Sequence, residues 1–420
     1  MIEQIKIDFD KILNNLKLSK ENVDLRKKNL SEFIKIGFPN NKNENWKFSD
    51  LNKIIASQIK NLKFYNKELI RNTREQPNLI DMKNPKFFEH NKIIVVDGVV
   101  ERIDFETYED VTKINIINTI ENEISKKKQS LVYLNNAFAT NYLKIIIKKD
   151  YSLKKPVILY NITSPEMLST NINQRIDFVL EENSKMSLIN FFLDDGKNNF
   201  INIFQNFDIE KNAIFKNYKF DTQENNNLKY VYNEIDLKEN SLVENFIISK
   251  GSKFFKNEIN CNLKEKYGSV FVNGIIDLKN NQHHEIKTNI NHLNENSKSY
   301  QLIKSVLSDN SRGVFQGKIF VDSIAQKTDG YQLSKALLLN ENCEFNAKPE
   351  LEIYADDVKC SHGSTSGNLD ENAIFYMMSR GLTYEKAKKL LINGFFLDVT
   401  DKITDPQVKL MAEILMEIEK

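Results

Sequence analysis

The sequence predicts a mainly β chain, in which a core of repeated strands lies between two helical ends. From about Leu143 onward, short β-rich runs alternate with small polar turns, and no long helical period appears. Within that stretch a two-residue turn signal recurs at intervals of 28 or 29 residues. A fixed period of this size without helices favours a parallel β-helix, with a β-sandwich as the competing architecture.

Residues 1–140 are predicted to be a mixed, largely helical region. Ser19 can cap a helix that ends near Gly37, and a second helix is expected after Asp50. The run Lys92–Val100 is typical of a strand that turns at Asp97-Gly98, because β-branched residues fill it up to that turn.

Residues 141–367 are predicted to form the β-rich core. Runs with the length and composition of strands are Tyr142–Lys148, Val157–Ile162, Ile176–Leu180 and Ser187–Leu193. The turn signals are Asn183-Ser184, Asn212-Ala213, Asn240-Ser241, Gly268-Ser269 and Asn296-Ser297, with Asn310-Ser311 following at half the interval. Asn and Ser suit tight turns because their side chains bond the local backbone.

Residues 368–420 are predicted to be helical again. Asp370–Arg380 can form one helix with Gly381 as its left-handed terminator. Thr383 can cap a second helix that buries Ala387, Leu390, Leu391 and Phe395. Pro406 suits the first turn of a third helix. The apolar seam of that helix consists of Val408, Met411, Leu415 and Ile418. Such a seam can pack on its own domain or dock a partner, and the spacing favours neither.

Composition excludes several classes of protein. The 59 basic and 58 acidic residues give a net charge of +1, which provides no field to attract nucleic acid or anionic lipid. Three widely spaced cysteines, Cys261, Cys343 and Cys360, suggest a reducing compartment rather than a disulfide framework. The start of the chain lacks a secretory signal, and no apolar run approaches the ~20 residues that span a bilayer. We therefore expect a cytoplasmic protein that binds neither nucleic acid nor membrane.

Two motifs resemble binding sites, one for phosphate and one for a metal ion, but the spacing of their residues excludes both. Gly313–Lys318 resembles a phosphate-binding loop, but its spacing is wrong by one residue and Ile319 stands where a magnesium-binding hydroxyl is needed. His283 and His284 cannot share one metal ion on a strand, because consecutive side chains point to opposite faces. The single tryptophan, Trp46, is expected to be a packing anchor. No Ser/His/Asp arrangement with an elbow motif is visible in the sequence.

Cys360 and His362 form the strongest candidate metal site. On an extended strand they share one face, with side-chain roots about 7 Å apart. A thiolate and an imidazole at that separation can bind one soft or borderline metal. Two ligands do not close a tetrahedral site, so further donors must come from elsewhere, such as Asp356-Asp357, or from a partner. On spacing alone, a buried cysteine beside a hydrogen-bonded histidine is the preferred interpretation.

The residues around this pair resemble the SufB/SufD family of the SUF iron–sulfur cluster assembly machinery, and within it the SufD type. The segments that carry the resemblance are Lys348–Thr365, Leu369-Asp370-Glu371 and Phe375–Gly381, with Lys327–Gly330, Leu337–Leu339 and Glu44–Leu51 as further matches. The resemblance covers roughly the last hundred residues closely, and the region near the start more weakly.

This resemblance implies a right-handed parallel β-helix core flanked by amino- and carboxy-terminal helical regions, and so favours the β-helix over the sandwich. It implies a non-catalytic scaffold that pairs through its core with a homologous SufB-type subunit and docks a SufC-type ATPase through its carboxy-terminal helices. A homodimer is one option for the isolated chain, whose oligomeric state the sequence leaves open. His362, with Cys360 in the same motif, would contribute to a transient iron–sulfur cluster at the shared interface, and the isolated chain would hold no cofactor tightly.

Two alternatives accompany this hypothesis. Cys343 lies near the position of an important SufB cysteine, which raises a SufB-like scaffold as an alternative; we interpret Cys343 as a packing residue. More remotely, β-helix folds also occur in polysaccharide-active enzymes, a class that the missing secretory signal disfavours.

Overall fold

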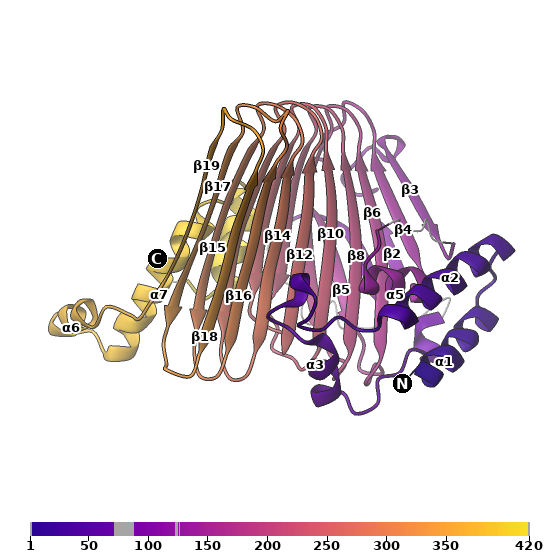
Figure 1. Cartoon of the computed structure of the whole chain (residues 1–420), viewed down its shortest axis with the longest axis horizontal. Helices are drawn as coiled ribbons and strands as arrows, with labels where there is room; N and C mark the ends of the chain where they lie inside the picture. Colours follow the sequence, from indigo (N-terminus) through magenta and orange to yellow (C-terminus); the bar gives the residue numbers. More distant parts are fainter. Residues whose placement is uncertain (1, 71–87, 122–124, 126, 419–420) are drawn as a thin grey trace.

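The computed structural model of the chain describes residues 2–70, 88–121, 125 and 127–418 (Figure 1). Its centre is a parallel β-solenoid of about eight turns, whose successive strands alternate between two facing sheets. Helices flank the solenoid at the amino- and carboxy-terminal parts of the chain. The prediction of a mainly β fold with a β-helix core is confirmed, and the sandwich is excluded.

Odd-numbered strands make one sheet and even-numbered strands the other, apart from the first pairs. In spatial order the first sheet contains β19 (Lys359–Gly367), β17 (Asp329–Leu338), β15 (Lys298–Leu307), β13 (Ser269–Leu278), β11 (Leu242–Ser249), β9 (Ile214–Asp221), β7 (Lys185–Asp194), β5 (Val157–Thr163), β1 (Asn91–Val96) and β2 (Val99–Asp104). The second contains β18 (Glu344–Ile353), β16 (Arg312–Val321), β14 (His283–His292), β12 (Phe254–Leu263), β10 (Leu228–Leu237), β8 (Phe200–Ile209), β6 (Asn171–Leu180), β4 (Tyr142–Ile147) and β3 (Ile114–Thr119). Among the strands that the structure describes, only β1–β2 and β3–β4 pair antiparallel. β1, β2 and β3 lie before residue 140 but already belong to the two sheets. The boundary predicted between residues 140 and 141 therefore stays a prediction.

The predicted turn signal marks one row of solenoid corners. Asn183, Asn212, Asn240 and Asn296 have φ between 53° and 60°, a left-handed conformation that asparagine adopts more readily than most residues. The small residues that follow them, Ser184, Ala213, Ser241 and Ser297, are buried. In the fourth repeat Tyr267 takes the left-handed position, so the predicted pair Gly268-Ser269 is shifted by one residue. Asn310-Ser311 precedes β16 in the other sheet, which explains its half interval.

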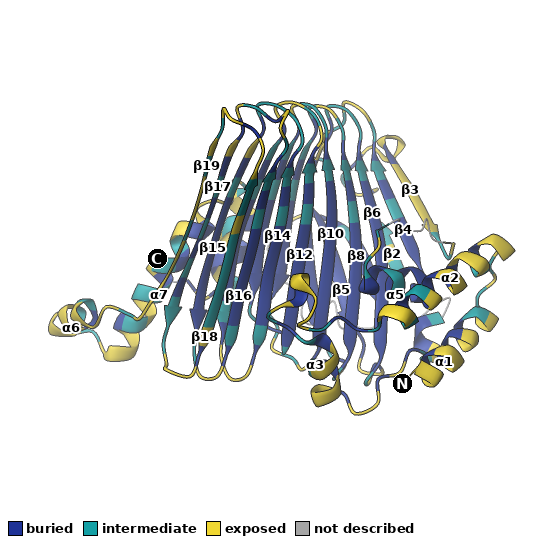
Figure 2. Cartoon of the chain, in the orientation of Figure 1, coloured by how far each residue is buried: buried dark blue, intermediate teal, exposed yellow. Residues whose placement is uncertain are grey.

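The solenoid interior is formed by alternate side chains of every strand, and it is continuously apolar over most of its length. Phe178, Phe207 and Phe215 illustrate the packing, with ring centroids 5.3 Å apart for the first pair and 4.8 Å for the second. Figure 2 shows that the middle strands are buried along most of their length, whereas the carboxy-terminal edge strands β18 and β19 are not.

The amino-terminal helices cover the outer face of the even-numbered sheet. The helical elements of the amino-terminal part are α1 (Ile2–Asn15), α2 (Lys20–Ile36), η1 (Glu44–Trp46), α3 (Leu51–Gln58), η2 (Lys67–Ile70), η3 (Val111–Lys113) and α5 (Ser130–Phe138), and residues of α1, α2, η1, α3 and α5 belong to the apolar cluster on this face. Ser19 and Asp50 cap α2 and α3 as predicted, and the strand turn lies at Asp97-Gly98. Trp46 packs against Tyr230, which confirms it as an anchor.

Two of the three carboxy-terminal helices, α7 and α8, cover the outer face of the odd-numbered sheet. The helices are α6 (Glu371–Ser379), α7 (Tyr384–Thr400) and α8 (Pro406–Leu415), and their predicted caps Asp370 and Thr383 are confirmed. Val408, Met411 and Ile418 are buried against the sheet, so the α8 seam packs on its own chain. Among the described helices, none has the length and apolar character to cross a membrane.

Candidate functional site

The last turn of the solenoid, formed by β18 and β19, leaves the edges of both sheets open. Each of these strands is hydrogen-bonded to a neighbour on one side only, β16 and β17 respectively. Strand edges of this kind present unpaired backbone donors and acceptors. The final turn therefore exposes two strand edges together with side chains that, one turn earlier, would belong to the core.

Cys360 and His362 lie on the inward face of β19, as the spacing predicts. Their partners across the pairing with β17 are Gly330 and Gln332, and both partners are interior residues. Because no further turn follows, His362 is exposed while Cys360 is half-buried. The structure thus places the two ligands of the candidate site together at the open end of the solenoid.

Cys360 is the less available of the two ligands. It packs against a small apolar cluster that includes Ile319, Val321 and Ala325. Burial there raises the pKa of the Cys360 thiol, with a smaller contribution from the charge of Asp329 and an opposing hydrogen bond from the backbone of Gly330. The thiol form is therefore favoured in the isolated chain, and of the two candidate ligands His362 is the more exposed.

His362 ends a row of inward side chains on the odd-numbered sheet that are polar except for one valine. The residues in register along this row are Asn217, Asn245, Val272, Gln301, Gln332 and His362. Asn217 donates to Asn245 over 3.0 Å, and the Gln332 amide donates to the Glu350 carbonyl over 3.2 Å. Gln332 Oε1 is buried without a hydrogen-bond partner among the described residues, so a polar acceptor lies one strand behind His362.

The carboxylates that the sequence offered as extra donors do not complete the site. Asp356 and Asp357 lie exposed in the turn between β18 and β19, where the backbone of Asp357 bonds with Gln326 and Lys327. Within residues 2–70, 88–121, 125 and 127–418, no three His, Cys, Asp or Glu side chains are grouped so that they could hold a metal ion. A metal ion held by Cys360 and His362 would therefore need further donors from beyond the described residues.

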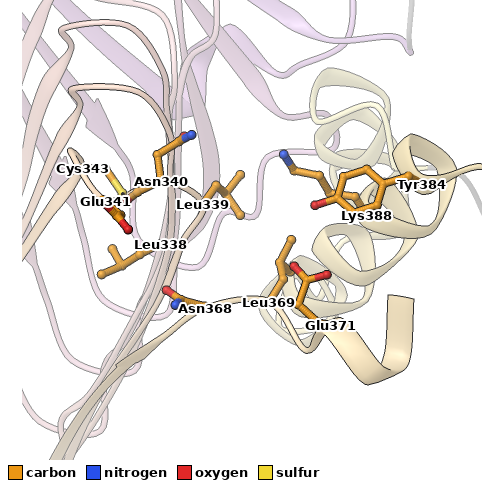
Figure 3. Close-up of a pocket in the computed structure, with 10 residues that line it drawn as sticks. All are labelled: Leu338, Leu339, Asn340, Glu341, Cys343, Asn368, Leu369, Glu371, Tyr384 and Lys388. Carbon is orange, nitrogen blue, oxygen red and sulfur yellow. Dashed lines mark hydrogen bonds between the residues drawn. The ribbon is translucent and has the colours of Figure 1, made fainter. Parts of the chain in front are cut away.

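Cys343 lies elsewhere, in the wall of a cavity of about 270 Å³ between the solenoid and the carboxy-terminal helices (Figure 3). Its thiol donates to the Asn340 carbonyl over 2.9 Å, and its side chain belongs to the main apolar core. Tyr384 and Lys388 of α7 form the opposite wall. These contacts support the interpretation of Cys343 as a packing residue.

The remaining motifs behave as the geometry predicted. Gly313–Lys318 lies inside β16, paired on both sides, and not in a loop that could hold phosphate. His284 points into the core, where Ser249 and the Ser252 carbonyl bond its ring, while His283 points outward to Glu285.

The two core histidines predict a pH-dependent stability. Burial lowers the pKa values of both His284 and His292 to about 4. For His284 the nearby charge of Asp221 raises the pKa and offsets part of this shift. The unfolded chain binds protons near the ordinary histidine pKa of about 6.5, so stability is complete above that pH and falls as pH drops toward 4. We expect each histidine to account for up to about 3 kcal/mol of this loss.

Urea unfolding at a series of pH values measures this effect. His292→Gln is expected to flatten the fall in midpoint between pH 6.5 and 4 relative to the unmodified chain. Parallel pH curves for the two proteins would show that the histidine is not the group responsible.

Helix α6 exposes a patch that the sequence patterns did not reveal. Phe375 is 74% exposed and Tyr376 59%, and Met378 lies on the same short helix with 43% of its surface exposed. Leu390 of α7, which was expected to be buried, is also 43% exposed, so that part of the prediction is wrong. Figure 1 shows α6 projecting away from the solenoid beyond the edge strands. Several exposed apolar side chains on one short helix are typical of an interaction surface.

Comparison with known proteins gives consistent matches over most of the chain. A family model described as SUF system FeS cluster assembly, SufBD core domain, matches residues 161–395. The iron–sulfur cluster assembly protein SufD of Escherichia coli is 26% identical over 90% of this chain and 89% of its own length. Protein ABCI7, chloroplastic, of Arabidopsis thaliana is 23% identical over 92% of this chain and 83% of its own length. An iron–sulfur cluster assembly SufBD family protein of Synechocystis is 26% identical over 64% of this chain and 62% of its own length.

Proposed function

This chain belongs to the SufBD family of iron–sulfur cluster assembly proteins and is SufD-like, and from that premise we propose that it is a non-catalytic scaffold subunit of a SUF complex. The observation that carries the proposal is the open last turn of the solenoid, where His362 and Cys360 lie exposed or half-exposed beside two free strand edges. A half-complete ligand set next to a pairing edge is what a site shared between two subunits requires.

Pairing with a SufB-type subunit is proposed to occur by strand addition at β18 and β19. Strand edges bind other chains through backbone hydrogen bonds, and side chains alternating along the strand supply specificity. On β18 the inward face ends in Pro349, Leu351 and Ile353, which would otherwise remain uncovered at the mouth of the solenoid. Covering this apolar mouth favours association with a homologous solenoid, or with a second copy of this chain when the partner is absent.

Docking of a SufC-type ATPase is assigned to α6 and the exposed side of α7. The alternative docking surface, the α8 seam, is already buried against the sheet. Phe375, Tyr376 and Leu390 supply apolar anchors on α6 and α7, and α7 contacts β13 and β15 of the solenoid. ATP hydrolysis would take place in that partner, and helix motion would reach the shared site through the α7 contact with β13 and β15.

Iron and sulfide are the cargo of the site and not resident groups. His362 would bind the nascent cluster through its imidazole, and Cys360 would join as a thiolate once the partner and the metal lower its pKa. The proposed setting is the cytoplasm, whose reducing conditions keep the described thiols free. The Arabidopsis relative is named chloroplastic, so a plastid is the corresponding alternative.

The test is reconstitution of the complex with SufB-type and SufC-type partners. His362→Ala is expected to lower the iron and acid-labile sulfide bound per complex by about tenfold, since a ligand is lost. Ser361→Ala is the matched control, because Ser361 lies on the same strand and faces the opposite way. Gel filtration establishes that each complex is intact. An intact His362→Ala complex with an unchanged cluster yield rules out the role given to His362.

A further inference from the structure

We propose that the outer face of the odd-numbered sheet carries a second, separate site that binds a planar heteroaromatic molecule with a ring N–H donor and an acidic group. The site is a cavity of about 390 Å³ between β11, β13, β15 and the connection from α7 to α8. Its lining residues are Glu244, Phe271, Asn273, Tyr300, Lys402 and Thr404. This volume lies within the range of small-molecule sites, which are mostly apolar with a few placed polar groups.

Aromatic rings form the apolar surface of the cavity. Phe271 and Tyr300 are partners in the register between β13 and β15, so their rings lie side by side on the sheet. Tyr300 is in turn stacked on Tyr331, with centroids 5.1 Å apart and an interplanar angle of 24°. The cavity therefore has aromatic side chains on which a flat ring can stack.

Asn273 is the polar group that specifies the ligand. It is 93% buried, between Phe246 and Leu302 in the register of the neighbouring strands, and its Oδ1 has no hydrogen-bond partner among the described residues. A buried acceptor without a hydrogen-bond partner lowers the stability of the folded protein, and none of the described residues offsets that cost. An acceptor in this position fits an N–H donor on the edge of a bound ring.

The rim of the cavity supplies a fixed wall and a positive charge. Thr404 donates to Glu244 over 2.8 Å, and Lys216 bonds Thr404 in turn, so this side is held in place and its carboxylate is engaged. Lys402 lies 5.9 Å from the centre of the Tyr300 ring, at the mouth of the cavity. An acidic group on the ligand would therefore lie near Lys402 while the ring stacks on Tyr300.

Binding of two small acids to the full chain tests the proposal. Indole-3-acetate carries a flat ring, an N–H donor and a carboxylate, and naphthalene-1-acetate is the matched probe that lacks the N–H. Calorimetric titration is expected to give a dissociation constant of about 1 mM for the indole and binding about tenfold weaker for the naphthalene.

Three variants separate the parts of the site. Asn273→Leu is expected to abolish the preference for the indole without lowering the unfolding temperature, because leucine suits its apolar neighbours. Tyr300→Ala is expected to abolish binding of both acids, and Lys402→Gln to weaken both by two- to threefold. Equal binding of the two probes by the unmodified chain, a preference that survives in Asn273→Leu, or no saturable binding of either probe would overturn the proposal.

Discussion

Replacing Lys229 by methionine is expected to cost about 3 to 5 kcal/mol of the free energy of unfolding. The Lys229 ammonium lies inside the solenoid, 2.5 Å from an Asp194 oxygen and 2.6 Å from an Asp221 oxygen, and all three side chains are almost completely buried. Burial alone would lower the pKa of Lys229, but the two carboxylates raise it, and Lys229 in turn holds the pKa of Asp221 below its ordinary value against burial. Without the lysine, two carboxylates remain buried with no cation beside them.

Equilibrium unfolding in guanidinium chloride measures the loss, with Lys264→Met as the matched control. Lys264 forms a pair of similar length, 2.6 Å, with Asp236, but its side chain is 49% exposed, so its removal is expected to cost less than about 1 kcal/mol. The triple variant Lys229→Met, Asp194→Asn, Asp221→Asn should recover much of the lost stability, since no unpaired charge remains. Equal losses for Lys229→Met and Lys264→Met would contradict this account.

Replacing Gly251 by alanine is expected to destabilise the same corner of the solenoid by about 3 kcal/mol. A Cβ at this position would lie 2.3 Å from the Gln223 carbonyl oxygen and 2.7 Å from its carbonyl carbon. These are backbone atoms of the preceding turn, and they cannot rotate away. The corner is further held by the Gly251 amide, which donates to the Asp221 carbonyl over 2.9 Å. A methyl group there must push two turns of the solenoid apart.

Gly394→Ala is the matched control for this substitution. Gly394 lies within helix α7, and a Cβ there meets no atom within 4 Å. Alanine at a helix interior is expected to raise stability by about 0.5 to 1 kcal/mol. Thermal unfolding of the two variants should therefore shift in opposite directions. A Gly251→Ala protein as stable as the unmodified chain would show that the corner relaxes more easily than its backbone contacts suggest.

Several features of the site and of the fold were predictable because each depends only on residues a few positions apart in the sequence. The common face of Cys360 and His362 follows from the two-residue period of a strand, and the divided faces of His283 and His284 follow from the same rule. The caps at Ser19, Asp50, Asp370 and Thr383 depend on one side chain and the backbone two or three residues beyond it. The repeat could be found because asparagine tolerates the left-handed conformation of the corner. The predicted turn pair was displaced by one residue in the fourth repeat, because Tyr267 takes that conformation there.

By itself the sequence determined the strand-rich core, its period, the helical ends and the pairing of Cys360 with His362 on one face. Only the tertiary structure decided that this face belongs to the last turn, that the α8 seam is covered while α6 is bare, and that Lys229 meets Asp194 and Asp221 in the core. The physical reason is register. In a solenoid each residue packs on residues about one turn away in the chain, and those contacts depend on where every corner falls.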